Sequence, residues 1–186
     1  GLLRQNWLLY IARIHPVKGQ KHSISVWNEL SEEIRSQSTL LIVGPPTENA
    51  ELDRIKNLIA QAKDKEKILY IGPTHDPRSW LRICDVYLSL SDFEGMPLGP
   101  LEGIGAGLPA LLSTIPAHEF LSKNSAPADT SNPQESAKSL EELIRHIPSM
   151  DDSSPEYYQS QWEKSQWIRD QFSLEEMTQQ YIHLYG

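Results

Sequence analysis

The chain has 186 residues, of which 39% are hydrophobic and 23% charged, a composition typical of a soluble globular domain with one sizeable core. Its formal net charge of −8 argues against a general nucleic-acid binder, since phosphate backbones are bound by clustered Lys and Arg. The single cysteine, Cys84, excludes an internal disulfide framework, and no stretch reaches the roughly 18 apolar residues of a membrane-spanning helix. We therefore expect a cytoplasmic domain. Because the first residue is Gly1, the natural N-terminus is expected to lie upstream, and targeting is not judged from this end.

Short apolar runs bounded by turn residues predict buried strands. They are WLLYIA at 7–12, LLIVG at 40–44, ILYIG at 68–72, VYLSLS at 86–91 and PALLS at 109–113. No further strand is expected after Ser113.

Helical spacing fills the segments between these runs and follows the last of them. The predicted helices cover 20–36, 49–64, 77–84, 98–105, 132–147, 154–171 and 173–186, with Asn132, Ser153 or Ser154, and Ser173 as N-caps. Strands that alternate with helices are typical of a parallel sheet with crossover helices, so we predict an α/β fold with a doubly wound parallel sheet and C-terminal helices. In such sheets ligands bind beyond the carboxyl ends of the strands, where five loops of this chain would share one rim.

Basic residues are concentrated at the start of the chain. The segment from Gly1 to Asn28 holds four basic residues and no Asp or Glu, whereas ten acidic and four basic residues follow from Glu135 onward. Arg13 and Lys18 stand just before Gly19 and a predicted helix, where a fork of N–H groups, a mobile ammonium and a helix N-terminus would suit a compact anion such as a diphosphate. The alternative is that both bases are solvated surface residues.

The stretch FEGMPLGPLEGIGAGLP at 93–109 places two carboxylates, Glu94 and Glu102, beside a glycine-rich turn. Its amides at Gly95, Met96, Leu98 and Gly99 precede a short helix and could hold an anion. A carboxylate only accepts hydrogen bonds, so it suits a hydroxyl-rich partner such as a ribose or a hexose. The alternatives are a surface Glu94 and a Glu102 that only complements the helix dipole, or a glycosidase pair, which the phosphate-binding loops disfavour.

Other chemistries are not indicated. The glycines of GIGAG lack the full dinucleotide-binding spacing. His15, His75 and His118 are not at metal-ligand spacing, and Cys84 has no adjacent base, so we expect no metal, no cofactor and no thiol chemistry.

The order of these motifs resembles the retaining glycosyltransferases of the GT-B fold (glycosyl transferases group 1), specifically their C-terminal, nucleotide-sugar-binding half. ARIHPVKG at 12–19 resembles the family's Gly-Arg-Leu-x-Pro-x-Lys-Gly loop, and the stretch at 93–113 resembles its Glu-x7-Glu signature continuing into Gly-Leu-Pro. FSLEEMTQQYIHLY at 172–185 is similar to its closing helix. The chain departs from the family's pattern at Ala12, where Gly is usual, and at Gly103, where Ala is usual.

The resemblance implies a role for each of these residues. Arg13 and Lys18 would bind the donor diphosphate and, together with Glu94, act in catalysis without a metal. Glu102 would accept hydrogen bonds from the ribose. Glu94 and the backbone of Gly95, Met96, Pro97 and Leu98 would meet the sugar and its phosphate, and the base would lie near Gly72 to His75.

The resemblance further implies that residues 1–186 form a single donor-binding domain. An N-terminal acceptor domain would be absent from this chain and would complete the interdomain cleft. The expected partners are a nucleotide diphosphate sugar, that missing domain and an unidentified glycan, lipid or other acceptor, in glycan or cell-surface polysaccharide synthesis. The missing domain could hold the protein peripherally at the inner face of the membrane. Two alternatives stay open: a stand-alone nucleotide-sugar-binding module without transferase activity, and half of a sugar-nucleotide epimerase.

Overall fold

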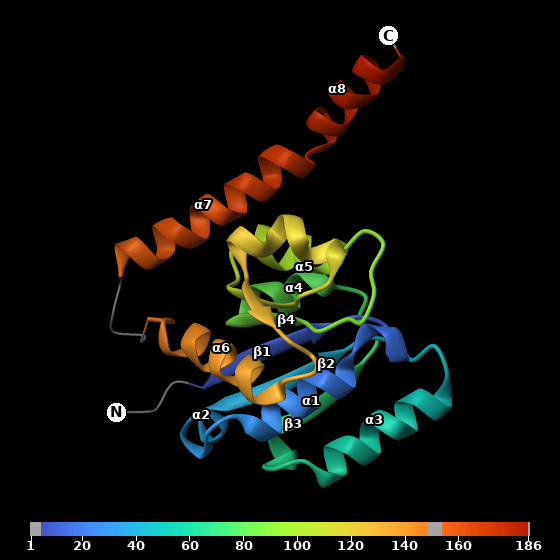
Figure 1. Cartoon of the computed structure of the whole chain (residues 1–186), viewed down its shortest axis with the longest axis vertical. Helices are drawn as coiled ribbons and strands as arrows, with labels where there is room; N and C mark the ends of the chain where they lie inside the picture. Colours follow the sequence, from blue (N-terminus) through green and yellow to red (C-terminus); the bar gives the residue numbers. More distant parts are fainter. Residues whose placement is uncertain (1–4, 149–153, 186) are drawn as a thin grey trace.

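A computed structural model describes residues 5–148 and 154–185 (Figure 1). The strands are β1 (Asn6–Ile11), β2 (Ser38–Val43), β3 (Ile68–Gly72), β4 (Val86–Ser89), β5 (Ala110–Ser113) and β6 (Ala126–Ala128). The α-helices are α1 (Gln20–Glu29), α2 (Glu32–Ser36), α3 (Asn49–Gln61), α4 (Pro77–Ile83), α5 (Leu98–Gly105), α6 (Pro133–Arg145), α7 (Pro155–Phe172) and α8 (Leu174–Tyr185). Short 3-10 helices are η1 (Pro16–Lys18), η2 (Lys65–Lys67) and η3 (Pro116–Asn124).

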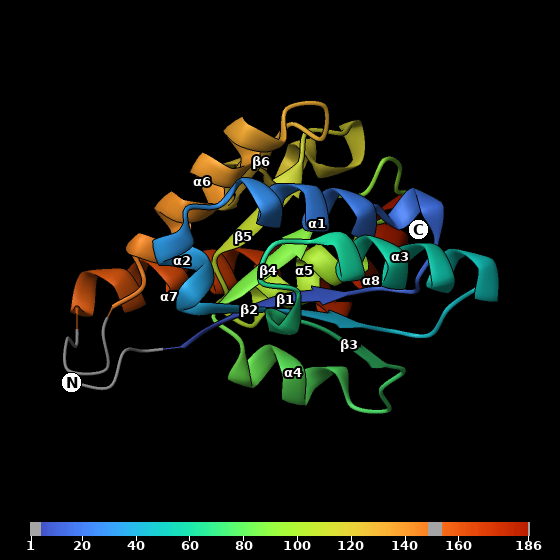
Figure 2. The ribbon, with the colours of Figure 1, turned by 90° about the horizontal axis from the view of Figure 1, so that it is seen from below.

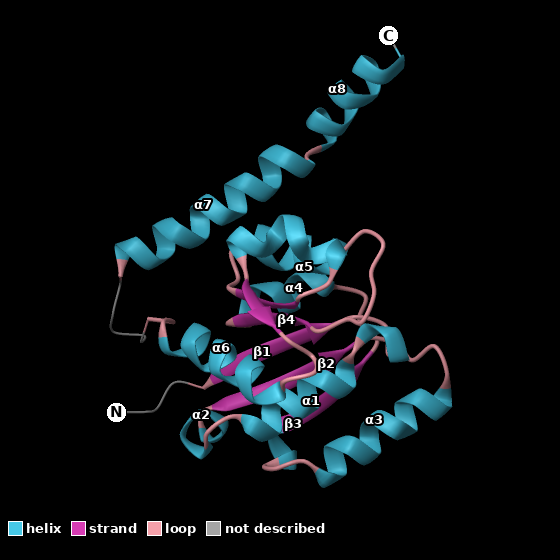
Figure 3. Cartoon of the chain, in the orientation of Figure 1, coloured by secondary structure: helices cyan, strands magenta, loops and turns pink. Residues whose placement is uncertain are grey.

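The strands form one parallel sheet in the order β3-β2-β1-β4-β5-β6, of which β3, β2, β1 and β4 are labelled in Figure 3. The order reverses between β1 and β4, so the sheet is doubly wound, as the alternating pattern predicts. The carboxyl ends of β1 and β4 lie at this switch point, which is where open α/β sheets form their ligand crevice.

Helices cover both faces of the sheet, and the central strand β1 buries side chains on both of its sides. Leu8 and Tyr10 belong to the core under α1, α3 and α6, whereas Leu9 between them belongs to the core under α4, α5 and α7. Figure 2 shows α1, α3 and α6 on one side of the strands and α4 on the other. All these strand residues are at most 1% exposed, so the sheet is a rigid base for the loops at its carboxyl edge.

The structure corrects two sequence-based expectations. A sixth strand, β6, follows the fifth, although its Ala-Pro-Ala sequence carries no strand pattern; Pro127 is tolerated because β6 is an edge strand. The helix predicted over 20–36 is divided, because Leu30 is extended and the Ser31 hydroxyl caps α2 by accepting from the Ile34 amide.

The C-terminal helices run across and beyond the sheet domain as one extended pair (Figure 1). The side chains of Asn132, Ser154 and Ser173 cap α6, α7 and α8, as predicted, while Ser153 lies outside the described residues. Helix α7 packs on α5 through buried Ile168 and a 2.7 Å hydrogen bond from the Ser165 hydroxyl to the Gly105 carbonyl.

Candidate functional site

A cavity of about 290 Å³ lies at the switch point of the sheet. Its walls come from the loop after β1, the end of β4 and the first turns of α5. Among its lining residues are Arg13, Lys18, Glu94, Met96, Pro97, Leu98 and Glu102. The structure thus brings together the two bases and both carboxylates predicted from the sequence. Gly95 lines an adjacent hollow that also contains Arg13, Lys18 and Glu94.

Lys18 and Glu94 form an ion pair in this cavity. The Lys18 ammonium lies 2.8 Å from Oε1 and 2.7 Å from Oε2 of Glu94, and the Glu94 side chain is only 9% exposed. The hydroxyl of Ser91 also donates to Glu94 Oε1, at 2.7 Å. A pair this well formed and this shielded from water is stronger than an ordinary surface salt bridge.

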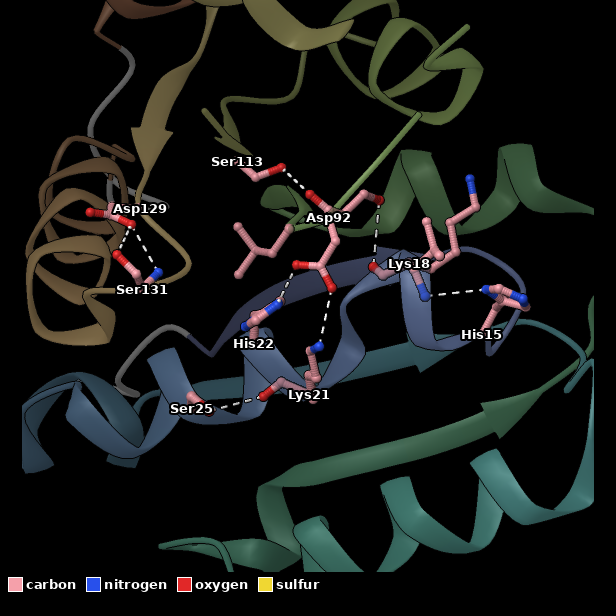
Figure 4. A network of polar contacts seen from close by, with 12 residues as sticks. His15, Lys18, Lys21, His22, Ser25, Asp92, Ser113, Asp129 and Ser131 are labelled. Carbon is pink, nitrogen blue, oxygen red and sulfur yellow. Dashed lines mark hydrogen bonds and ion pairs between the residues drawn. The ribbon is translucent and has the colours of Figure 1, made fainter. Parts of the chain in front are cut away.

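Basic residues of the N-terminal segment have acidic neighbours in the folded chain, although the segment itself contains no Asp or Glu. Asp92 accepts from Lys21 at 3.1 Å and lies 2.8 Å from His22 Nε2 (Figure 4), and both partners lower the pKa of its carboxyl against the effect of burial. Both acidic partners, Asp92 and Glu94, belong to the loop after β4, which is about seventy residues away along the chain. Arg13 is exposed, and its guanidinium has no ion-pair partner among the residues that the structure describes.

Two buried contacts fix the loop after β1 against the end of β4. Gly19 has a φ of +70°, and a Cβ there would lie 1.9 Å from the Leu90 carbonyl oxygen, so only glycine permits this approach. The Tyr10 hydroxyl donates to the Lys18 carbonyl and accepts from the Leu90 amide at 2.8 Å. Burial raises the pKa of Tyr10, which keeps this hydroxyl neutral. Lys18 and Glu94 are thereby held facing each other.

Helix α5 packs close to β4 because it has glycine at the two positions that face Tyr87. A Cβ at Gly103 would lie 2.5 Å from the Tyr87 ring, and one at Gly99 would lie 2.4 Å from its hydroxyl. Buried Tyr87 thus accounts for glycine at 103, where the resembling family usually has alanine. The Leu98 amide donates to the Met96 carbonyl at 3.0 Å, so within this turn it is already engaged and not open to an anion.

The exposed carboxylate of Glu102 lies between two hollows. On its far side a larger cavity, of about 670 Å³, is lined by His75, Asp76, Glu102 and three arginines, Arg78, Arg82 and Arg169. Gly72 lines neither cavity, and its carbonyl accepts from the Gly44 amide at 2.8 Å. Within the region predicted to meet the base, His75 thus lines this cavity next to the start of α4, and Gly72 does not. The three arginines lie on α4 and α7, and no motif indicates them.

Sequence reasoning also missed the surroundings of His118. This side chain is 3% exposed, and its Nδ1 lies 2.9 Å from the Ser113 carbonyl, so Nδ1 carries the proton. Its Nε2 is buried and has no hydrogen-bond partner within residues 5–148 and 154–185. Burial lowers the pKa of His118, while the Ser113 carbonyl and the Glu94 charge oppose that shift. His118 thus lies buried within electrostatic reach of Glu94.

The described residues 5–148 and 154–185 contain no group of three His, Cys, Asp or Glu side chains that could hold a metal ion. No helix in the same ranges is both long and apolar enough to cross a membrane.

A parallel, doubly wound sheet with a cavity at its switch point is the arrangement in which open α/β domains bind their ligands. The sequence model of the family "Glycosyl transferases group 1" matches residues 3–159. The chain belongs to this family of glycosyltransferases.

Two curated relatives are longer than this chain. An uncharacterized glycosyltransferase of Haemophilus influenzae is 24% identical over 183 residues, covering 96% of this chain and 48% of the relative. An Escherichia coli UDP-Gal:alpha-D-GlcNAc-diphosphoundecaprenol alpha-1,3-galactosyltransferase is 38% identical over 128 residues, covering 67% of this chain and 32% of the enzyme. The chain therefore spans half or less of the length of these relatives.

Solved structures have the same fold as this chain. A glycosyltransferase from Rickettsia africae superposes with a TM-score of 0.84 at 18% identity, over 97% of this chain and 47% of that protein. Anabaena HepE, in complex with UDP and glucose, superposes with a TM-score of 0.82 at 16% identity, over 97% of this chain and 48% of that protein. These matches identify the fold as one half of a GT-B glycosyltransferase.

Proposed function

We propose that this chain is the donor-binding half of a retaining glycosyltransferase that transfers a sugar from a nucleotide diphosphate to an acceptor. The observation that carries the proposal is the single cavity containing Arg13, Lys18, Glu94 and Glu102. Its bases suit a diphosphate and its carboxylates suit hydroxyl groups. UDP and a UDP-sugar are the ligands named for HepE, which supports a nucleotide-sugar donor here.

In the proposed reaction the protein, rather than a metal, stabilises the departing diphosphate. Arg13 offers a free guanidinium fork, and Lys18 exchanges its Glu94 partner for a phosphate oxygen. Charge stabilisation of a leaving group by positioned donors is a large contribution to catalysis. Glu94, released from Lys18, accepts hydrogen bonds from the sugar, and Glu102 accepts from the ribose.

A second domain upstream is proposed to supply the acceptor site. Three apolar side chains at the rim of the cavity are open to solvent: Phe93 at 70%, Met96 at 52% and Leu98 at 63% exposure. Exposed apolar side chains clustered beside a ligand site commonly mark an interaction surface. The Escherichia coli relative, whose name gives a diphosphoundecaprenol-linked sugar as acceptor, favours cell-surface glycan synthesis for this protein too.

Calorimetry with UDP, using uridine as the comparison ligand, tests the donor site. Arg13→Ala and Lys18→Ala are each expected to weaken UDP binding about tenfold or more, because a hydrogen bond to a charged group contributes roughly 1.5–3 kcal/mol. Uridine affinity should change little. Lys56→Ala, at an exposed position on α3, is the matched control for a lost positive charge.

The possible outcomes separate the alternatives. UDP affinity that is unchanged in both variants would make Arg13 and Lys18 ordinary solvated residues. UDP binding with the expected losses, but no release of UDP from a UDP-sugar by the protein extended through its upstream sequence, would instead support a stand-alone binding module.

A further inference from the structure

Ser91 connects the end of β4 to Glu94 from inside the protein. It is 1% exposed, and its hydroxyl donates to Glu94 Oε1 at 2.7 Å. The Ser91 hydroxyl oxygen also lies 3.5 Å from the Lys18 carbonyl oxygen. This contact is too long to compete with Glu94 for the single hydroxyl proton. Ser91 thus holds one of the two carboxylate oxygens of Glu94.

The backbone of Ser91 is itself fixed by the neighbouring strand. The Ser113 hydroxyl, at the end of β5, donates to the Ser91 carbonyl at 2.7 Å (Figure 4 shows Ser113 beside Asp92). His118 Nδ1 donates in turn to the Ser113 carbonyl at 2.9 Å. All three residues are at most 4% exposed, so these hydrogen bonds are shielded from water. Buried hydrogen bonds from the end of β5 and from η3 therefore fix the position of Ser91, and through Ser91 that of Glu94.

Among the described residues, Lys18 donates the other hydrogen bonds that Glu94 accepts. If the Lys18 ammonium binds a diphosphate, it cannot at the same time keep both short contacts to the Glu94 carboxylate. When Lys18 turns to the donor, the Ser91 hydroxyl is the remaining described group that donates to Glu94. It occupies Oε1 and leaves Oε2 open for a sugar hydroxyl.

We propose that Ser91 is a positioning residue for the sugar end of the donor: it keeps Glu94 in place after Lys18 has moved to the diphosphate. This inference rests on the proposed donor site and adds a residue to it. Ser91 acts through Glu94 and touches neither the diphosphate nor the ribose. Its removal should therefore lower the affinity gained from the sugar without lowering that for the bare nucleotide.

The test compares UDP with UDP-glucose and UDP-galactose on the 186-residue chain, and its readout is the ratio of the UDP Kd to the Kd of the tighter UDP-sugar. Ser91→Ala is expected to lower this ratio about fivefold or more while the UDP Kd changes less than about twofold, as for loss of a hydrogen bond to a charged group. Ser91→Thr, which keeps the hydroxyl, should restore the ratio. Ser136→Ala is the matched control, since Ser136 is also 1% exposed and donates at 2.8 Å, to the Asp129 carbonyl.

A double-mutant cycle with Glu94→Gln tests the pathway directly. In that background Ser91→Ala should have no further effect on the ratio. An equal loss of UDP and UDP-sugar affinity in Ser91→Ala, or a full additional effect in the Glu94→Gln background, would overturn this inference and leave the proposed function standing. An unaltered chain that binds UDP but gains nothing from either sugar would also overturn it. A chain that binds none of the three ligands would overturn the proposed function, and this inference with it.

Discussion

Glu94 and Glu102 line one cavity in different surroundings. Glu94 is 9% exposed and bound by Lys18 and Ser91, whereas Glu102 is exposed and stands between the two hollows at the switch point. Within the described residues the Glu94 carboxylate has ion-pair and hydrogen-bond partners and the Glu102 carboxylate has none, so we expect the two to bind different parts of the proposed donor. The ribose is common to a nucleoside diphosphate and a nucleotide sugar, so a ribose-binding residue affects both ligands.

Glu102→Gln is expected to weaken UDP and a UDP-sugar alike, by about tenfold, because a charge-assisted hydrogen bond is replaced by a neutral one. Glu94→Gln should leave UDP binding within about threefold and reduce the additional affinity that the sugar provides. Calorimetric titration of both variants with both ligands measures the two effects. Equal effects of the two substitutions on the two ligands would refute the division of roles.

His118 gives the folded protein a pH dependence at the edge of the site. Burial lowers the pKa of His118 from its usual 6.5, so the folded state favours the neutral imidazole. Between the folded pKa and about 6.5 the unfolded chain binds more protons than the folded chain. The His118 contribution to stability is therefore complete above pH 6.5 and is lost as the pH falls toward the folded pKa.

His118→Gln should accordingly flatten the dependence of the unfolding free energy on pH between 7 and 5, whatever it does to stability at pH 7. Gln keeps an N–H for the Ser113 carbonyl but does not titrate in this range. Urea unfolding at a series of pH values gives the slope for each protein. A variant as steep as the unaltered chain over this interval would mean that the buried imidazole does not set the slope.

At the scale of the elements, the packing of α5 on β4 depends on the absence of a side chain at Gly103. A Cβ there would lie 2.5 Å, 2.7 Å and 3.0 Å from three atoms of the ring of Tyr87, a residue that is 2% exposed. Such overpacking of a core typically costs about 1–3 kcal/mol.

Gly103→Ala should therefore lower the free energy of unfolding by about 1–2 kcal/mol, even though alanine favours the helix by up to about 1 kcal/mol. Chemical denaturation measures the change. Gly95→Ala is the control, since a Cβ at Gly95 meets no atom within 4 Å, and it should shift stability by less than about 0.5 kcal/mol. A Gly103→Ala variant as stable as the unaltered chain would show that Tyr87 can yield.

Most elements could be predicted because their patterns are local. Apolar runs between turn residues locate the strands from β1 to β5, and helical spacing locates most helices to within a few residues. The missed elements lack such a pattern: β6 is three residues long and contains Pro127, and the break after Leu30 depends on capping by Ser31. These features are decided by neighbours in space and by single side-chain hydrogen bonds.

At the scale of the whole molecule, the sequence predicted which residues meet but not how they pair. Arg13, Lys18, Glu94 and Glu102 share a cavity because the loops after β1 and β4 converge at the switch point. The Lys18–Glu94 pair joins positions 76 residues apart, so the local excess of bases conceals it. The arginines beyond Glu102 come from α4 and α7, which only the folded chain brings to one hollow.

The relatives are about twice as long as this chain or longer, and we propose that a second domain contacts the apolar side chains at the rim of the cavity. Phe93, Met96 and Leu98 are each more than half exposed, so their replacement removes little buried area from this domain. A Phe93→Ser, Met96→Ser, Leu98→Ser variant of the 186-residue chain is expected to unfold within about 1 kcal/mol of the unaltered chain. Its Kd for UDP should also stay within about threefold of that of the unaltered chain.

In the protein extended through its upstream sequence, the same three substitutions should slow UDP release from a UDP-sugar about tenfold or more. The closed cleft would lose apolar contacts that together amount to roughly 1.5 kcal/mol or more. Denaturation, calorimetry and a coupled UDP-release assay measure the three quantities. Unchanged turnover in the extended protein would show that its second domain does not rest on this rim, and a large loss of stability in the short chain would show that the three side chains pack within their own domain.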